Sequence, residues 1–280
     1  MKNVIRIGMS TSCVYPLSTE NAFRLARLAG FDGIEVMVTN DPVTQDAAAL
    51  LELSRQYELP ILSVHAPVLL LTQLVWGLDA TVKLRKSAEL AQAVGATTVV
   101  VHPPFRWQGR YARTFENTVR ELAHEFDLEL AVENMFPWHV GPLTLRGYSP
   151  SPDPTAVDCD AITLDFSHAA LGGRDSLEFA HSMADRLRHV HLCDGPGSMT
   201  DGYIFDEHRV PGHGSQPVAE VLRYLATRKW SGSIVAEVNT RGAKSEQARL
   251  DMLIETREFA QRHLSPRRRS RGARTEFGIS

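Results

Sequence analysis

The sequence predicts a single (β/α)8 barrel, and three observations predict it. The chain has 280 residues, close to the usual length of such a barrel, which is about 250 residues. Eight short apolar or β-branched runs alternate with amphipathic helical stretches. The runs are almost continuously apolar, which is typical of parallel strands that helices cover on their outer side. A closed ring of eight parallel strands satisfies all three observations.

The strand-like runs follow one another at regular intervals and are short enough for barrel strands. They are residues 4–10, 33–38, 60–65, 97–102, 128–134, 161–167, 189–194 and 233–239. Helical stretches, with apolar residues at three- and four-residue spacing, lie between most of them. These helices are expected over 19–29, 45–57, 81–94, 114–126, 176–187, 217–227 and 246–263. Gly30, Gly95 and Gly232 stand where a helix should end or the chain should turn into a strand.

One connection departs from this regular pattern. Residues 136–160, FPWHVGPLTLRGYSPSPDPTAVDCD, are rich in proline and glycine, and we expect an irregular segment with at most a short helix near Thr155. Loops of this length are often functional. The sequence shows no internal repeat and no second domain. We therefore assign residues 1–264 to the barrel and residues 265–280 to a disordered, arginine-rich tail.

Charge and cysteine content narrow the function classes. The net charge is −3, but the last fifteen residues carry five arginines and one glutamate, so the rest of the chain has a net charge of −7. An acidic body argues against a nucleic-acid partner. The three cysteines are far apart and form no CxxC pair, which argues against a disulfide framework and a thiolate zinc site. With no signal-peptide pattern and no membrane-spanning run, we expect a cytoplasmic protein.

Metal-competent side chains gather at the carboxyl ends of the predicted strands. Because these ends meet around one mouth of a barrel, where barrel enzymes place their sites, the side chains are expected to lie close together. Burying several carboxylates without compensation is costly, and a divalent metal is the simplest compensator. Oxygen and nitrogen ligands favour manganese, zinc, iron, cobalt or magnesium. The residues are His65, His102, Glu133, Asp165, His168, His191 and Glu237, with Glu35 as a weaker member more typical of a salt bridge.

Seven short motifs resemble those of the xylose isomerase-like barrel superfamily, which includes ketose 3-epimerases, sugar-phosphate isomerases and endonuclease IV. They are GFDGIEV, VHAP, AVENM, TLDFSH, HVHLCD, VPGHG and VAEVN, in the family's order. The resemblance implies one metal site with the ligands Glu133, Asp165, His191 and Glu237. It also implies proton transfer beside a carbonyl that the metal holds, with Glu133 and Glu237 as the two bases and His168 bonded to a substrate hydroxyl.

The resemblance to endonuclease IV implies a second arrangement, with three zinc ions. The stretch DEHRVPGHG supplies Asp206 and His208 for a third ion, and Glu133 would bridge two ions. In the alternative arrangement with one ion, His65, His102 and His208 contact the substrate instead. The nine residues that match the endonuclease ligands are His65, His102, Glu133, Asp165, His168, His191, Asp206, His208 and Glu237.

Three functions therefore stay open. The first is a metal-dependent isomerase or epimerase of a small sugar or sugar phosphate; Arg106 or Arg110 would meet a phosphate or carboxylate and Trp107 would stack on a sugar, unless they only pack at the start of a helix. The second is a multinuclear zinc phosphoester hydrolase, and the third is a catalytically silent sugar- or protein-binding barrel. The apolar stretch 65–79 would serve as a lid, a contact to a second copy of the chain, or simple packing.

Overall fold

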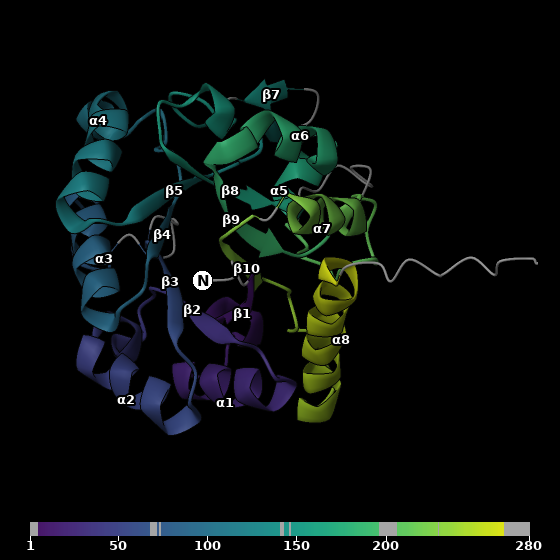
Figure 1. Ribbon diagram of the computed structural model, residues 1–280. Coiled ribbons are helices and arrows are strands. Elements are labelled where there is room, and N and C mark those ends of the chain that lie inside the picture. The colour runs from purple at the N-terminus through teal and green to yellow at the C-terminus, as the bar shows by residue number, and fades with distance from the viewer. Residues whose placement is uncertain are drawn as a thin grey trace, which may run out of the picture.

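A computed structural model of the chain describes residues 5–67, 72, 74–140, 143–145, 147–195, 206–228 and 230–265. Eight parallel strands close into a barrel in the order β1-β10-β9-β8-β5-β4-β3-β2 (Figure 1). The predicted (β/α)8 barrel is thereby confirmed. The strands are β1 Arg6–Ser10, β2 Gly33–Met37, β3 Ile61–His65, β4 Thr98–Val101, β5 Glu129–Glu133, β8 Ala161–Asp165, β9 Leu187–Leu192 and β10 Ser233–Ala236.

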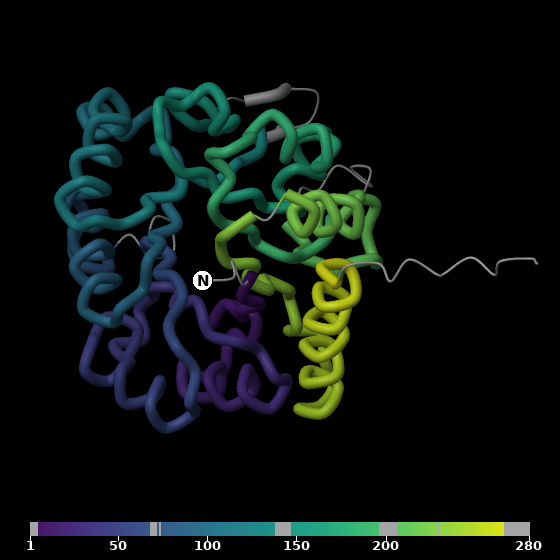
Figure 2. Tube along the Cα trace, viewed as in Figure 1, coloured from purple at the N-terminus to yellow at the C-terminus, as the bar shows by residue number. Residues whose placement is uncertain are grey.

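The helices surround the strands and follow the chain around the ring, as the colour gradient in Figure 2 shows. The ring is completed where the last helix lies beside the first one. There Arg24 on the first helix forms an ion pair with Glu246 on the last, at 2.6 Å. The α-helices are α1 Thr19–Ala29, α2 Ala47–Tyr57, α3 Ala80–Val94, α4 Gly109–Phe126, α5 Phe166–Leu171, α6 Ser176–Met183, α7 Val218–Thr227 and α8 Glu246–Leu264. None of the helices within the described ranges is long and apolar enough to cross a bilayer.

The helix ends follow the local sequence signals. Gly30 and Gly95 end α1 and α3 with φ of 80° and 74°, the left-handed conformation in which a Cβ is strained. Asp165 begins α5 by accepting a hydrogen bond from the backbone N–H of His168 at 2.7 Å. Asp165 is thus both the cap of α5 and a predicted metal ligand. Its hydrogen bond to the helix holds the carboxylate at the barrel mouth.

The register of the strands places the predicted ligands at one level of the barrel. Asp165 at the end of β8 is paired with His191 on β9, and Glu133 at the end of β5 is paired with Thr163 on β8. Glu237 directly follows β10. Because all eight strands are parallel, these positions belong to the same carboxyl-terminal mouth.

The structure corrects several expectations. The connection 136–160 is not fully irregular, because β6 Trp138–Val140 and β7 Leu143–Leu145 form an antiparallel hairpin, although the short helix near Thr155 is present as η4 Pro154–Ala156. Helix α4 begins at Gly109 rather than at residue 114. The helix expected over 176–187 ends at Met183, because the next residue, Ala184, has φ of 50°. Residues 266–280 of the expected tail lie outside the described residues.

Candidate metal centre

Four side chains from four strand ends converge at the mouth of the barrel. Glu133, Asp165, His191 and Glu237 each offer a ligand atom, and these atoms all lie within 4.8 Å of one another. The residues are 1%, 0%, 0% and 7% exposed, respectively. We call these four residues the inner quartet. It contains three carboxylates and one imidazole, removed from bulk water.

A single ring nitrogen lies at the middle of the quartet. The Nδ1 of His191 is 2.9 Å from Glu237 Oε2, 3.0 Å from Glu133 Oε1 and 3.7 Å from Asp165 Oδ2. One nitrogen carries at most one proton and cannot satisfy three carboxylates. A divalent cation fits this donor set better than a proton does, since oxygen and imidazole ligands suit manganese, zinc, cobalt, iron or magnesium.

Without an ion, the imidazole of His191, whose pKa the neighbouring carboxylates raise against the opposing effect of burial, is the main compensation for the glutamates. Burial alone would raise the pKa of Glu133, but the imidazoles of His191 and His102 lower it well below its usual range. Burial likewise opposes the effect of His191 on Glu237, whose pKa falls to about 2. The pKa of Asp165 is raised, chiefly by burial. The quartet thus binds positive charge, and a metal ion would compete with protons for it.

His65 and His102 adjoin the quartet through Glu133. The Nε2 of His102 is 2.8 Å from Glu133 Oε2, and the Nε2 of His65 is 3.4 Å from the same oxygen. This oxygen makes no hydrogen bond among the described residues, despite the short distances. The Nδ1 of His65 is 3.1 Å from the carbonyl oxygen of Ala66 and donates to it, so in the neutral ring the lone pair of Nε2 points toward the carboxylate. These three side chains form a second group able to hold an ion.

A third group, formed by His168, Asp206 and His208, also adjoins the quartet, since the Nδ1 of His168 lies 3.2 Å from Glu133 Oε1. The Nε2 atoms of His168 and His208 lie 3.0 Å and 2.8 Å from Asp206 Oδ2. Their Nδ1 atoms face the carbonyl oxygens of Asn134, at 2.9 Å, and Glu237, at 2.7 Å. With the Nδ1 proton donated to a carbonyl, each neutral ring directs a lone pair toward the carboxylate. This arrangement requires additional protons or a cation between the three side chains.

Asp194 holds the loop that carries Asp206 and His208. Its carboxylate accepts hydrogen bonds from the backbone N–H groups of Gly195, Gly212 and Gln216, at 2.9 to 3.1 Å. A Cβ at Gly214 would collide with Asp194 Oδ1 and with the carbonyl oxygen of Gly195. Gly214, the second glycine of VPGHG, is therefore required because the loop passes directly over a buried carboxylate.

Several residues of the site were missed or given little weight in the sequence. Glu35 and His189 are buried against His191, and Ser12 Oγ donates to Glu237 Oε1 at 3.1 Å. Cys193, whose pKa burial raises to about 12, has its Sγ 3.6 Å from Asp165 Oδ2. The spacing of His189 and His191 was an available signal, because residues two apart on a strand point to the same face.

The predicted substrate-contact residues after β4 lie on the surface. Arg106 and Arg110 are exposed, and Trp107 is 58% exposed. The ring of Trp107 stacks on that of Phe105, with centroids 4.5 Å apart, and Phe105 stacks on Tyr148. The side chains of Arg106, Trp107 and Arg110 are thus not buried together with the inner quartet. Their contact with a substrate stays a prediction.

Comparisons with known proteins agree with this fold. An uncharacterized protein of Mycobacterium tuberculosis is 44% identical over 284 residues, covering 94% of this chain and 99% of the relative. The fructoselysine 3-epimerase of Escherichia coli O157:H7 is 22% identical over 263 residues, covering 84% of this chain and 91% of the relative. The crystal structure of a D-tagatose 3-epimerase-like protein superposes with a TM-score of 0.69 at 22% identity, covering 93% of this chain and 97% of that one.

The family description of xylose isomerase-like TIM barrels matches residues 23–260, which include all nine predicted ligands of the three groups. Both the strand order and the motifs agree with this match. The chain belongs to the xylose isomerase-like TIM barrel family.

Proposed function

We propose that the chain is a divalent-metal-dependent isomerase or epimerase of a small sugar or sugar phosphate. The observation that carries the proposal is the convergence of Glu133, Asp165 and Glu237 on one nitrogen of His191. These four residues would hold the ion. When bound, it would stabilise negative charge on a substrate oxygen beside the carbon that loses its proton. The names of the fructoselysine and D-tagatose relatives support a carbohydrate as substrate.

The two glutamates have different surroundings, as two bases with separate roles require. Glu133 directs its second oxygen toward His65 and His102, whereas Glu237 directs its second oxygen toward Ser12 Oγ. A proton taken by Glu133 would therefore lie against imidazoles, and one taken by Glu237 would lie against a hydroxyl. The burial of both carboxylates excludes bulk water from the proton transfer.

Solvent isotope exchange tests this proposal even though the sugar is unidentified. The metal-loaded chain is incubated in deuterated water with ketopentoses, ketohexoses and their phosphates, and NMR follows deuterium at the carbons beside the carbonyl. We expect exchange with at least one member of the panel, and its loss in the double variant Glu133→Gln with Glu237→Gln. No exchange with any member, from a chain that contains metal, would refute the proposal.

A second function is favoured by one specific observation. His65, His168 and His208 each have Nδ1 against a backbone carbonyl, which leaves each Nε2 facing a carboxylate, and the two outer groups could each hold a further ion. Three ions around one mouth would suit phosphoester hydrolysis, in which metals activate a water and stabilise the leaving oxygen. Zinc accepts this mixture of imidazole and carboxylate ligands.

The double variant Asp206→Ala with His208→Ala separates the two functions. In a multinuclear hydrolase it loses about one zinc ion per chain and its activity toward a generic phosphodiester such as bis(p-nitrophenyl) phosphate. In a one-ion isomerase it keeps its metal and loses substrate affinity. Elemental analysis of the wild-type chain after zinc saturation and gel filtration provides the reference. About one ion per chain supports the isomerase, and two or three ions support the hydrolase.

A further inference from the structure

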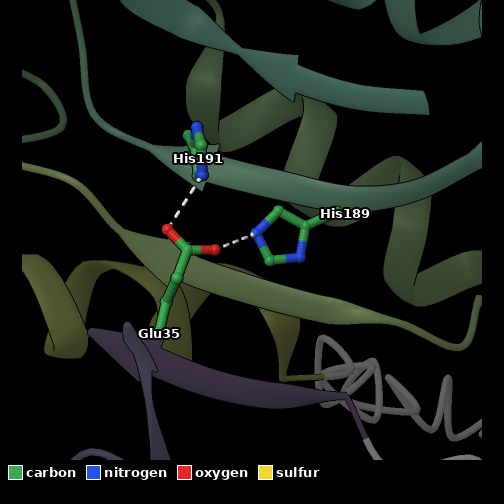
Figure 3. Close-up of side chains that lie close together, drawn as sticks. All are labelled: Glu35, His189 and His191. Carbon is green, nitrogen blue, oxygen red and sulfur yellow. Dashed lines mark hydrogen bonds and ion pairs between the residues drawn. The ribbon is translucent and has the colours of Figure 1, made fainter. Parts of the chain in front are cut away.

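A fourth buried carboxylate contacts the inner quartet from outside it. Glu35 lies on β2 and His191 on β9, and in the barrel order β1 and β10 separate these two strands. Glu35 is 0% exposed, as are His189 and His191. Figure 3 shows its carboxylate between the two rings, with one oxygen directed at each. An ionised carboxylate this deeply buried requires close partners, and it finds them across the barrel.

The two nitrogens of His191 face different carboxylates. Nδ1 faces the inner quartet, and Nε2 lies 3.2 Å from Glu35 Oε1. A neutral imidazole has a proton on one nitrogen and a lone pair on the other. A nitrogen that binds a metal must have the lone pair, so the proton must be on Nε2 when His191 acts as a ligand. Glu35 is placed to accept that proton in a hydrogen bond.

The other contacts of Glu35 involve its Oε2 and leave Oε1 to His191. Ser63 Oγ donates to Oε2 at 2.7 Å. The Nε2 of His189 is 2.9 Å from the same oxygen, at an angle that does not make a hydrogen bond. Both of these partners are therefore on Oε2, and Oε1 is turned toward His191. The carboxylate is thus oriented by β3 and β9 before any ion arrives.

We propose that Glu35 is a positioning residue for the metal centre. It accepts the Nε2–H of His191 and so selects the tautomer whose Nδ1 lone pair faces Glu133, Asp165 and Glu237. This inference rests on the metal site of the proposed function but not on the identity of the sugar. Outer carboxylates of this kind orient metal-binding histidines and increase their basicity, and their loss typically weakens metal binding about 10- to 100-fold.

Zinc affinity in a set of variants tests the inference. Competition with a chromogenic chelator gives the affinity of the wild type, Glu35→Leu, Glu35→Gln and Ser63→Ala. We expect Glu35→Leu to bind zinc about 10- to 100-fold more weakly, because it fills the space without an acceptor. Glu35→Gln keeps an amide oxygen that accepts from Nε2–H, so much of the affinity should return. Ser63→Ala removes one of the groups that orient the carboxylate and should weaken zinc binding less than Glu35→Leu does. The control is Ser87→Ala, a buried serine on α3 whose hydroxyl bonds to the carbonyl oxygen of Lys83, and it should leave the affinity unchanged.

A spectroscopic readout separates positioning from general destabilisation. Long-range 1H–15N NMR of the zinc-loaded chain should show the His191 proton on Nε2 in the wild type and in Glu35→Gln. Thermal unfolding of the metal-free variants reports loss of packing independently. Should Glu35→Leu fail to fold, Glu35→Asp carries the same expectation, because the shorter side chain withdraws the carboxylate from His191.

The outcomes distinguish this inference from the proposed function. A folded Glu35→Leu variant with wild-type zinc affinity overturns the role of Glu35 and leaves the centre intact. A variant that loses one of two bound ions, while the other keeps its affinity, also overturns it, because Glu35 and the two histidines would then be an ion site of their own. A wild-type chain that binds no zinc, manganese, cobalt or magnesium overturns the centre and this inference together.

Discussion

Asn134 and Asp165 are joined by two hydrogen bonds at the mouth of the barrel. The Oδ1 of Asn134 accepts from the backbone N–H of Asp165 at 2.7 Å, and its Nδ2 donates to the carbonyl oxygen of Asp165 at 3.0 Å. Both residues are fully buried. Because β5 and β8 are neighbouring strands, an amide at the end of one fixes the main chain at the end of the other. The position of the Asp165 carboxylate thus depends on a residue with no ligand atom in the quartet.

Replacing this amide should therefore weaken both the fold and the centre. Asn134→Leu keeps the volume but leaves the buried backbone N–H of Asp165 without an acceptor, which costs about 1–3 kcal/mol, whereas the carbonyl oxygen of Asp165 keeps its bond within α5. We expect a lower free energy of unfolding in urea and weaker zinc binding by chelator competition. Asn117→Leu, an exposed position on α4, is the control and should change neither quantity. Wild-type zinc affinity in folded Asn134→Leu would show that Asp165 needs no such support.

Removing the charge of Asp165 should abolish tight metal binding without removing the start of a helix. Asparagine begins helices as well as aspartate does, so Asp165→Asn retains the cap of α5 while it removes one anionic ligand. Metal content after gel filtration should fall close to zero. The control is Asp175→Asn, the corresponding cap of α6, which should keep the wild-type metal content. Metal retained in Asp165→Asn would remove Asp165 from the ligand set.

The single variants of the two glutamates should have asymmetric effects on an epimerase. Each epimer loses its proton to a different base, so Glu237→Gln should stop net conversion yet retain deuterium exchange from one epimer, and Glu133→Gln should retain it from the other. NMR in deuterated water measures both, with metal in excess because each change also removes an anionic ligand of the inner quartet. Net epimerisation in either single variant at the wild-type rate would exclude the two-base scheme.

The metal-free chain should lose stability as pH rises above neutrality. Burial alone would lower the pKa of His191, yet the carboxylates of Glu237 and Glu133 raise it well above its ordinary value of 6.5, and the pKa values of His168 and His208 are raised in the same direction. A raised folded-state pKa stabilises the fold below the unfolded pKa, and this stabilisation is lost as pH rises through the folded pKa.

Thermal unfolding from pH 6 to pH 9, with a chelator or with zinc, measures this effect. With chelator, the melting temperature should fall as the imidazoles lose their protons. With zinc, it should fall less, because an ion replaces those protons. Parallel curves in the two conditions would mean that the imidazoles and the ion do not share the same carboxylates.

Gly214→Ala should displace the loop that carries Asp206 and His208. The new Cβ would collide with the buried Asp194 carboxylate and a backbone carbonyl, and overpacking of this kind typically costs about 1–3 kcal/mol. Zinc bound by His168, Asp206 and His208 should be lost before zinc bound by the inner quartet. Gly242→Ala is the control, since a Cβ there meets nothing within 4 Å. Equal zinc content and stability in both variants would show that the loop tolerates the shift.

The barrel was predictable because strand and helix periodicities alternate along the whole chain. Helix α1 was predicted with the observed bounds, since a serine cap precedes it and Gly30 ends it. The hairpin β6–β7 was not, because its strands have three residues each and lie among prolines and glycines. Helix α5 was missed because it begins directly after the strand that ends at Asp165, which leaves no loop between the two elements.

The convergence of the strand-end residues was predictable from parallel topology alone. The residues that hold these ligands in position were not predictable in this way. Glu35 was only a weak candidate in the sequence, more typical of a salt bridge, and only the closed barrel shows that it faces His191 from across the ring. Asn134 stands beside a predicted ligand, but its role depends on the main chain of β8. Contacts across a barrel follow from closure, and no local pattern encodes them.

The order of the ligands along the chain sets when an ion can be captured. Glu133 lies near the middle of the sequence, whereas Glu237 follows β10, the last strand of the barrel. A chain still being synthesised on the ribosome therefore lacks a ligand of the quartet until every strand has been made. The complete ligand set therefore exists only once the last strand of the barrel has been made, so binding of an ion by all four residues couples metal capture to closure of the barrel.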